Sequence, residues 1–427
     1  MLHGYFRCIS EPTRATLIFA KLLEFLYPIG IAGFEAVLPI VGLFHKKAAR
    51  RATYRSLPWP KRSRGRWIWV HAASVGEYEQ ARPILEAWRT QEQGKVLLSF
   101  YSPSGIEQVA QDAADAIIMF PGDLKKPMEA LLAHYNPEFA LFVKAELWPV
   151  SLSVLEKAGI PSALVAFAPG RSKAWAGLGA AFWKKQLNRL SWISCQDSSA
   201  AHFLLQLGME SHRVHVDGNP RLDRLQGLIK EFPKDTNASK DPLWLIAGST
   251  WPADEKLLFS ALKKAPKWNL LCAPHQPEKA QVTQLLALGE KLGGAMAWSE
   301  LSQSPMDEWP RVVVVDGLGE LKRLYRFGSA AYVGGGFGRS IHSCLEPAAY
   351  GLPMAFGPKL GGSIEAQAFL EMGTASQVKN ANDLLEWMQR MEATAVRKKD
   401  EQMLLGWFDE QSGAGSRVLE RIKAHLK

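Results

Sequence analysis

Short apolar runs alternate with amphipathic, helix-like segments along most of the chain after residue 66. Near-continuous apolar strands separated by helices are typical of a parallel sheet that is covered on both faces. The pattern therefore predicts an α/β fold with doubly wound, Rossmann-like sheets. In the first half of the chain, a helix is expected over 77–90 and strands at 67–73, 96–102, 116–120, 139–145, 162–168 and 192–197. This half is expected to end near residues 213–219.

A polar stretch rich in helix breakers, residues 228–242, divides the alternation and is interpreted as a linker. A second alternation follows, with strands expected at 243–249, 269–275, 311–317, 330–336 and 352–358. Ligands of such sheets bind beyond the carboxyl ends of the strands, so a site is expected in a cleft between two halves. The predicted domains are 1–65, a membrane-anchoring segment, 66–227, an acceptor-binding domain, and 243–427, a nucleotide-sugar-binding domain.

The N-terminal stretch 15–44 is strongly apolar but carries three charged residues and two prolines. Its longest uncharged run, Phe25–Phe34, is shorter than the ~20 residues that a spanning helix needs. We therefore expect one helix, or a pair broken near Pro28 and Pro39, that lies in or dips into one leaflet. The alternative interpretation is a buried helical hairpin. A cleavable signal peptide is not expected, because the basic residues follow the apolar segment.

Positive charge is concentrated in one window of the chain. The net charge is +9, and nine basic residues with no acidic residue among them lie at Lys46, Lys47, Arg50, Arg51, Arg55, Lys61, Arg62, Arg64 and Arg66. The rest of the chain is balanced, which argues against nucleic-acid binding by a generally basic surface. Cations beside an apolar helix favour anionic membrane lipids, at about 1 kcal/mol each, and place the remaining chain on the cytoplasmic face.

Composition narrows the possible classes of protein further. Hydrophobic residues make up 47% and charged residues 22%, as in ordinary globular proteins, which excludes disorder. The four cysteines, Cys8, Cys195, Cys272 and Cys344, are scattered, which fits a reducing compartment and argues against structural zinc. Three histidines, His71, His275 and His342, also lack the spacing of metal ligands.

Two glutamates follow predicted strands of the first half. Glu77 opens a helix after the strand at 67–73, and there the helix dipole is expected to keep its carboxylate ionised at neutral pH. An ionised carboxylate facing a cleft can act as general base for an alcohol. Glu146 follows another strand, and so is expected at the same edge of the sheet. For each glutamate a purely structural role remains open; for Glu77 this is a helix-terminal charge beside a serine cap.

The second half contains a glycine-rich turn, Gly334–Gly338, between a strand and a helix. Such turns let the backbone approach a phosphate, although this one fits neither the dinucleotide nor the P-loop pattern. No Asp-x-Asp occurs in the chain, so sugar transfer would have to proceed without a metal held by that motif. Arginine, lysine and helix dipoles would then carry the charge of the phosphate.

Taken together, nine motifs in order resemble the 3-deoxy-D-manno-octulosonic acid (Kdo) transferases of Gram-negative bacteria. The resemblance extends from the N-terminal anchor to about Val378. The stretches that carry it are HAASVGE (71–77), AELWP (145–149), GRS (170–172), GNPRLD (218–223), AGSTWPADE (247–255), PHQPE (274–278), DGLGEL (316–321), VGGG (333–336) and IHSCLEPAAYGLPMAFGP (341–358).

The resemblance implies a GT-B fold, a CMP-Kdo donor, no further cofactor, and a lipid A precursor as acceptor at the inner membrane. It implies that Glu77 is the catalytic base and that Glu146 and Arg221 stabilise the transition state. It assigns CMP binding to Pro274, His275, Leu318, Gly319, Glu320, Ser343, Cys344, Leu345 and Glu346.

Three positions depart from the family pattern. The family often has Lys at Arg221, Arg-His at His275-Gln276, and His-Asn at His342-Ser343. Two other interpretations remain: a metal-free GT-B enzyme acting on another nucleotide sugar, such as a transferase or an epimerase, and a non-catalytic membrane-bound nucleotide-binding module. Intact Glu77, Glu146 and Arg221 argue against the last.

Overall fold

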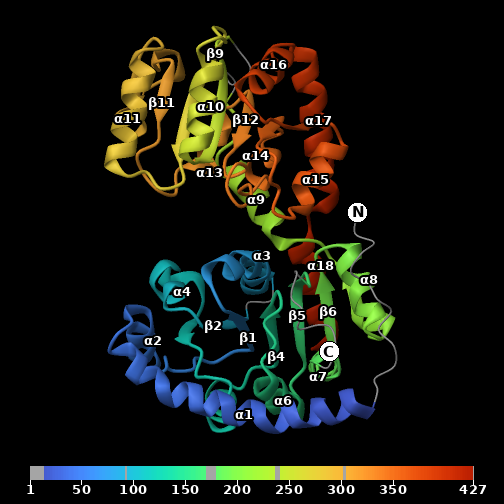
Figure 1. Cartoon of the computed structure of the whole chain (residues 1–427). Helices are drawn as coiled ribbons and strands as arrows, with labels where there is room; N and C mark the ends of the chain where they lie inside the picture. The colour runs from blue at the N-terminus through green and yellow to red at the C-terminus, as the bar shows by residue number, and fades with distance from the viewer. Residues whose placement is uncertain (1–13, 92–93, 170–178, 236–240, 302–303, 427) are drawn as a thin grey trace. The chain divides into compact units, whose positions relative to one another are not determined.

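The computed structural model describes residues 14–91, 94–169, 179–235, 241–301 and 304–426 (Figure 1). The chain divides into two compact units. The N-terminal unit contains Met1–Arg224 and Ser412–Lys427, and the C-terminal unit contains Leu225–Gln411. Each unit is built on a seven-stranded sheet whose neighbouring strands are parallel, as the alternating pattern predicts.

The sheet of the N-terminal unit has the strand order β3-β2-β1-β4-β5-β6-β7. The central strands are buried along their whole length, because helices cover both faces. In register, His71 of β1 lies beside Ser99 of β2 and Phe142 of β4. The strands are β1 (Trp67–Ala72), β2 (Lys95–Phe100), β3 (Ala116–Met119), β4 (Phe139–Val143), β5 (Ser162–Phe167), β6 (Trp192–Cys195) and β7 (Val214–Val216).

Several helices of this unit begin at residues that reduce the number of unpaired backbone N–H groups in the first turn. Asp197 accepts a bond from the Ala200 N–H at the start of α8, and prolines occupy the first position of α4 and α6. The helices that follow the strands are α3 (Val75–Gln91), α4 (Pro103–Gln108), α5 (Lys125–Tyr135), α6 (Pro149–Lys157), α7 (Ala180–Leu187) and α8 (Ser198–Gln206). Helix α9 (Pro220–Glu231) begins in this unit and continues into the C-terminal unit, which starts at Leu225.

The C-terminal unit has the strand order β10-β11-β9-β8-β12-β13-β14. Its strands are β8 (Leu243–Thr250), β9 (Trp268–Pro274), β10 (Ala295–Ala297), β11 (Val312–Val314), β12 (Ala330–Val333), β13 (Met354–Phe356) and β14 (Ala375–Gln377). Its helices are α10 (Pro252–Leu262), α11 (Lys279–Glu290), α12 (Trp298–Leu301), α13 (Leu321–Leu324), α14 (Leu345–Ala349), α15 (Ile364–Glu371), α16 (Ala381–Met391) and α17 (Thr394–Gln411). The short edge strands β10 and β14 have no counterpart in the sequence prediction.

The boundaries of the units differ from those expected at two points. Helix α9 runs to Glu231, so the first residues of the expected linker are helical; residues 236–240 lie outside the described part. The last helix, α18 (Ala414–His425), belongs to the N-terminal unit rather than to the C-terminal domain. Val418, Leu419 and Ile422 bury their side chains in the core of the N-terminal unit, which explains this assignment.

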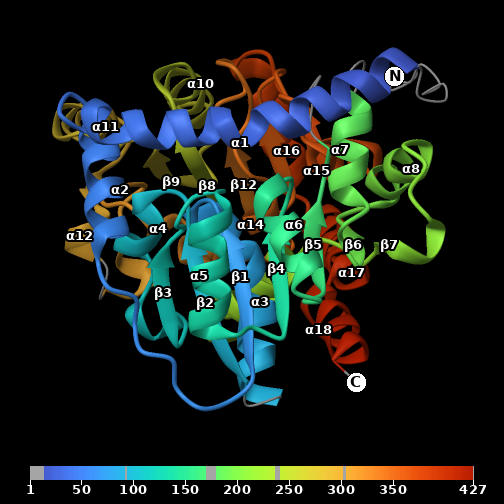
Figure 2. The same cartoon turned by 90° about the horizontal axis from the view of Figure 1, so that it is seen from below.

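The N-terminal segment forms one continuous helix, α1 (Arg14–Gly42), which runs through both prolines, followed by α2 (Lys46–Ser56). Within α1, Thr16–Gly42 is long and apolar enough to cross a membrane by length and composition. Figure 2 shows α1 as a single rod that extends from α2 to α7. Its inward side contacts the unit, but most of its apolar residues are exposed, so it is not a buried core helix: Leu17, Ile18, Leu22, Phe25, Leu26, Ile29, Phe34, Val37, Ile40 and Val41.

Several of the nine clustered cations bind protein groups, which differs from the expectation that all of them face a membrane. Arg51 and Arg55 both pair with the buried carboxylate of Glu35 on α1, with an Arg51 Nη2 to Oε1 distance of 3.0 Å. Arg50 pairs with Glu107, Arg66 pairs with Glu138, and Arg62 donates to the Tyr135 carbonyl. Among the residues that the structure describes, the cations of this cluster without an ion pair or side-chain hydrogen bond are Lys46, Lys47, Lys61 and Arg64.

Candidate functional site

Glu77 lies in the first turn of α3, directly after the carboxyl end of β1. Its Oε2 accepts a hydrogen bond of 3.1 Å from the backbone N–H of Ser74, three residues earlier. A glutamate at the third helical position that bonds back to the residue before the helix is half of a capping box. The structural role considered for Glu77 is therefore present, and it also fixes where the carboxylate lies.

Glu146 lies in the turn between β4 and α6, near Lys144. The backbone of Lys144 has φ = +62°, a left-handed conformation that is uncommon for a residue with a side chain. Such conformations persist where the surrounding structure holds them, and they are frequent at functional sites. The charges of Lys144 and Glu77 both act on Glu146, so the turns after β1 and β4 bring the two predicted glutamates into one electrostatic cluster.

Burial raises the pKa of Glu146 to about 7, and the negative charge of Glu77 adds to the rise. The indole N–H of Trp148 and the Lys144 ammonium oppose it. Burial also raises the pKa of Glu77, while backbone N–H groups and Lys144 oppose this shift. Burial thus acts against the helix N-terminus, which is expected to favour the ionised form of Glu77. Glu146 changes its protonation state near neutral pH.

Arg221, the third predicted catalytic residue, lies in the first turn of α9, and its backbone N–H bonds to Asn219 Oδ1 at 3.1 Å. Lys144 lowers the pKa of both glutamates. The structure thus brings Glu77, Glu146 and Lys144 together. Lys144 is a functional candidate that was not predicted from the sequence, although it lies only two residues before Glu146.

The turn that carries Arg221 is held by the end of the chain. Asp223 accepts bonds from the backbone N–H groups of Gly413 and Gly415, at 2.5 and 2.6 Å. The buried carboxylate of Asp217 pairs with Arg421 of α18 at 2.9 Å. The GNPRLD motif is therefore positioned by residues almost 200 positions later, a signal that no local pattern contains. The GRS motif, residues 170–172, lies outside the described residues.

His71, considered above as a metal ligand, is fully buried inside the N-terminal unit. Its Nδ1 lies 2.9 Å from Ser99 Oγ, and its ring lies 4.5 Å from that of Phe120. Burial lowers the pKa of His71 to about 3, so the imidazole is neutral at physiological pH. The residues that the structure describes contain no group of three or more His, Cys, Asp or Glu side chains able to hold a metal ion.

In the C-terminal unit, the rings of Trp251, His275 and His342 form an aromatic stack at the carboxyl end of β9. Of these three residues, His275 is a predicted CMP contact. The ring of His275 lies 4.8 Å from Trp251 and 4.5 Å from His342, nearly parallel to both. Burial and the neighbouring His275 lower the pKa of His342. Pro274 ends β9, and the His275 N–H bonds to the Thr250 carbonyl at 2.9 Å. Trp251 was not among the predicted binding residues, although it belongs to the AGSTWPADE motif.

The glycine-rich turn is organised by Asp254 of α10, another residue that sequence reasoning left without a role. Its carboxylate accepts bonds from the Gly335 N–H at 3.0 Å, the Tyr332 hydroxyl at 2.8 Å and the Trp251 N–H at 2.9 Å. A Cβ on Gly334 would lie 2.3 Å from the Ser249 carbonyl oxygen. The glycine is therefore required by the close approach of two backbone segments of the fold itself.

The remaining predicted nucleotide contacts lie on two loops of the same unit. Glu346 is buried in α14 directly after Cys344 and Leu345. Burial, and to a smaller extent the charge of Glu346, raises the pKa of Tyr325. The Ser343 hydroxyl accepts a bond from the Leu345 N–H at 3.3 Å. On the loop after β11, Leu318 is 78% exposed, Gly319 has φ = +91°, and Glu320 contacts Trp298 and Arg323.

Two parallel α/β units are the architecture of GT-B enzymes, and solved structures support this fold. A UDP-GlcNAc 2-epimerase from Neisseria meningitidis bound to UDP-GlcNAc matches with a TM-score of 0.58 at 14% identity, over 84% of this chain and 100% of that one. The calicheamicin glycosyltransferase CalG4 matches with a TM-score of 0.53 at 11% identity, over 85% of this chain and 99% of that one. At such identities these likenesses establish the fold alone.

Sequence comparisons show what the chain is similar to. Residues 45–224 match the family model described as 3-deoxy-D-manno-octulosonic-acid transferase (kdotransferase). The Kdo transferase of Haemophilus influenzae is 26% identical over 84% of this chain and 87% of its own length. The Kdo transferase of Bordetella pertussis is 25% identical over 84% of this chain and 87% of its own length. The Kdo transferase of Aquifex aeolicus is 25% identical over 74% of this chain and 84% of its own length. The chain is a glycosyltransferase. These matches confirm the resemblance to the Kdo transferases that the sequence motifs indicate.

Proposed function

We propose that this protein transfers Kdo from CMP-Kdo to a lipid A precursor, lipid IVA, during lipopolysaccharide biosynthesis. The similarity to Kdo transferases over most of the chain supports the sugar and the pathway. The observation that carries the chemistry is the pair of glutamates in the N-terminal unit, because the pKa of Glu146 is about 7 and responds to the charge on Glu77. Such a pair can hold one carboxylate ionised and the other protonated at neutral pH.

In the proposed reaction, Glu77 is the general base. Its two backbone contacts and Lys144 favour the ionised form, which can accept the proton of the attacking acceptor hydroxyl. The acceptor oxygen forms a bond to the anomeric carbon of Kdo, while the bond to the CMP phosphate oxygen breaks and CMP departs with the electron pair. Attack from the face opposite the leaving group inverts the anomeric centre. Glu146, in its protonated form, stabilises the negative charge that develops on the departing phosphate oxygen.

For the donor, we propose that the C-terminal unit binds CMP. Trp251, His275 and His342 form a stack of rings, and the flat face of such a stack can bind the aromatic base of CMP. The imidazole groups of the stack could instead contact its phosphate. The buried carboxylate of Glu346 would accept hydrogen bonds from the ribose hydroxyls. CMP leaves as a phosphate monoester with less charge than a nucleoside diphosphate. We therefore propose that the reaction needs no metal and no cofactor besides the donor.

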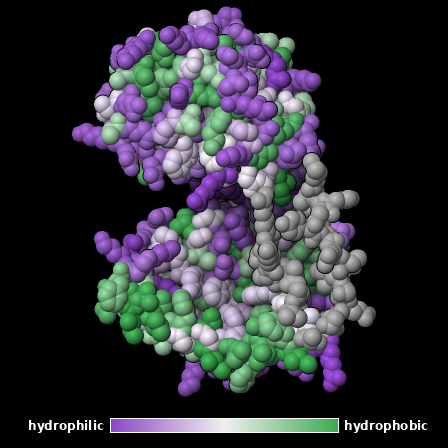
Figure 3. All heavy atoms as spheres, viewed as in Figure 1, coloured by the Kyte–Doolittle hydropathy of each residue, from purple (hydrophilic) through white to green (hydrophobic). Residues whose placement is uncertain are grey.

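We also propose that the enzyme works at the cytoplasmic face of the inner membrane, with α1 in the lipid interface. The apolar side of α1 that faces away from the unit is exposed, and Figure 3 shows hydrophobic residues along the edge of the N-terminal unit where α1 runs in Figure 1. A contiguous exposed apolar face of this kind is typical of a membrane contact. The cations without a protein partner, such as Lys46 and Lys47, would contact anionic headgroups.

Purified protein mixed with CMP-Kdo and lipid IVA tests the proposal directly. We expect release of CMP and a Kdo-modified lipid, and no product when UDP- or GDP-sugars replace the donor. Glu77→Gln should lower turnover by ~10²–10⁴-fold, the usual contribution of a general base, with CMP binding nearly unchanged. Product formation from another nucleotide sugar alone would disprove the assignment of the donor, and near wild-type turnover of Glu77→Gln would disprove the assignment of the base.

A further inference from the structure

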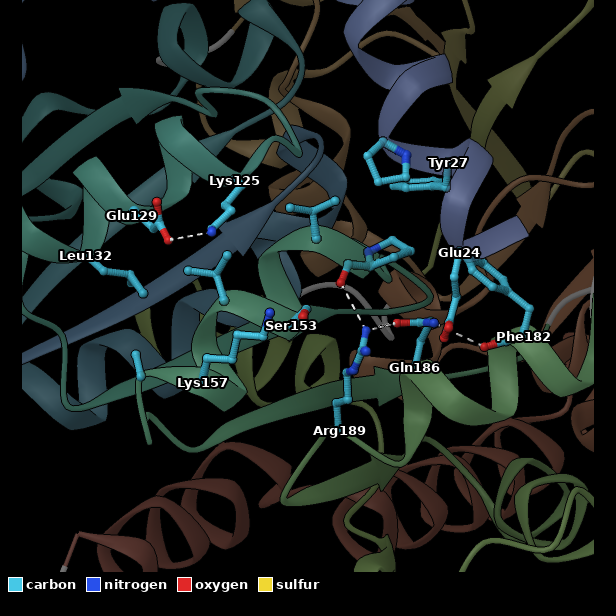
Figure 4. A pocket seen from close by; sticks show the side chains of 15 residues that line it. Glu24, Tyr27, Lys125, Glu129, Leu132, Ser153, Lys157, Phe182, Gln186 and Arg189 are labelled. Carbon is cyan, nitrogen blue, oxygen red and sulfur yellow. Dashed lines mark hydrogen bonds and ion pairs between the residues drawn. The ribbon is translucent and has the colours of Figure 1, made fainter. Parts of the chain in front are cut away.

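A cavity of about 610 Å³ lies between α1 and the helices α5, α6 and α7 of the N-terminal unit (Figure 4). Glu24, Tyr27 and Pro28 of α1 line one side of it. The lining residues do not include either catalytic candidate, Glu77 or Glu146. The cavity is therefore distinct from the pair of glutamates, although α6, which forms one of its walls, begins three residues after Glu146.

The walls of this cavity, called here the α1 pocket, combine an apolar interior with cations. Tyr27, Leu132, Val150, Val154 and Phe182 contribute apolar surface from all four helices. The side chains labelled in Figure 4 place Lys125 on α5, Lys157 on α6 and Arg189 after α7 around this interior. Such a combination suits an amphiphile whose charged group is anionic.

The cations are only partly neutralised by protein carboxylates. Lys125 lies 3.8 Å from Glu129, and Arg189 lies 3.2 Å from Glu156. Arg189 also donates to Gln186 Oε1 at 2.6 Å, which holds its guanidinium in place. Lys157 forms no ion pair with the residues that the structure describes. Counting the lining alone, three cations face the two carboxylates of Glu24 and Glu129, which leaves about one positive charge.

We propose that the α1 pocket binds one anionic phospholipid of the membrane in which α1 lies. Its headgroup phosphate contacts Lys125, Lys157 and Arg189, and its glycerol and first methylenes contact the apolar walls. Because α1 is about 10 Å in diameter, a helix lying in the interface puts the pocket beside it at headgroup depth. One net positive charge matches a single phosphodiester, whereas a lipid A-type acceptor carries more than one phosphate. The proposal rests on the membrane association proposed above, and not on the transfer reaction.

Photo-crosslinking tests the proposal with the full-length protein. The probe is a phosphatidylglycerol that carries a diazirine near the glycerol, dispersed in phosphatidylcholine vesicles, and labelled peptides are identified by mass spectrometry. We expect label in the peptides covering 125–132 and 149–158. Lys125→Gln with Lys157→Gln should reduce this label about tenfold or more, since each cation near an anionic lipid contributes roughly a factor of five. Lys263→Gln with Lys264→Gln removes the same charge from exposed positions of the C-terminal unit and should leave the label unchanged.

A steric variant keeps the test independent of charge. Ser153→Trp, on α6, should fill the pocket and abolish the label, whereas Ser153→Ala should retain it. Equal labelling by the matching phosphatidylcholine probe, or equal loss of label in both lysine pairs, would overturn the proposal. Competition by lipid IVA at the same concentration as unlabelled phosphatidylglycerol would also overturn it, because the pocket would then belong to the acceptor. CMP release measured on the same samples reports the transfer reaction separately.

Discussion

Replacing Glu146 with glutamine should stabilise the N-terminal unit above neutral pH, even though it lowers activity. Burial raises the pKa of this carboxyl from 4.5 to about 7. A carboxyl whose pKa is raised in the folded state contributes stability that is fully present below pH 4.5 and is lost as the pH rises through 7. Glutamine has no proton to lose, so the variant escapes that loss.

The magnitude follows from the pKa shift. At about 1.4 kcal/mol for each pH unit, moving the pKa from 4.5 to about 7 corresponds to roughly 3 kcal/mol at alkaline pH. Coupling to Glu77 and contact with solvent reduce this figure, so we expect about 1–3 kcal/mol. In a unit of this size, each kcal/mol shifts the melting temperature by about 2–4 °C. The gain should be near zero at pH 4.5 and reach its full value by pH 8.

Thermal unfolding followed by circular dichroism from pH 4.5 to 8.5 measures the effect. Glu210→Gln provides a matched control, because its side chain is 64% exposed and it should show no growing gain with pH. An equal melting-temperature difference at all pH values would show that the substitution acts through packing. A loss of stability at pH 8 would show that the Glu146 carboxylate is stabilised by its surroundings, and would refute the reasoning.

Three further predictions follow from named contacts. Arg51→Met removes one of the two arginines that pair with the buried Glu35, and should lower the free energy of unfolding by about 3 kcal/mol; Lys46→Met should change it little, and equal melting temperatures would contradict this. Glu346→Ala should raise the KM for CMP-Kdo by about 5–150-fold, from ~1–3 kcal/mol of lost hydrogen bonding, and leave the KM for the acceptor unchanged; an equal rise in both would argue against a ribose contact. Activity should survive EDTA, and a loss that Mg²⁺ restores would show that the phosphate does need a metal.

The sequence alone was sufficient for the fold class and for part of the candidate site. Apolar runs such as 67–73 predict buried parallel strands, because a strand covered on both faces has no polar side to show. Since parallel strands end at one edge of a sheet, Glu77 and Glu146 could be expected near each other, and their charges do interact. The three-residue edge strands β10 and β14 were missed, because so short a run has no recognisable period.

Only the tertiary structure decided what surrounds each group. It assigned α18 to the N-terminal unit, where its residues fix Asp217 and Asp223, and it paired Arg51 with Glu35 instead of leaving the whole basic cluster to the membrane. It also raised the pKa of Glu77 where the helix position alone suggested an easily ionised carboxylate. Hydropathy periods depend on neighbours along the chain, and they predict elements. Desolvation and ion pairing depend on neighbours in space, and these are known only when the elements are packed.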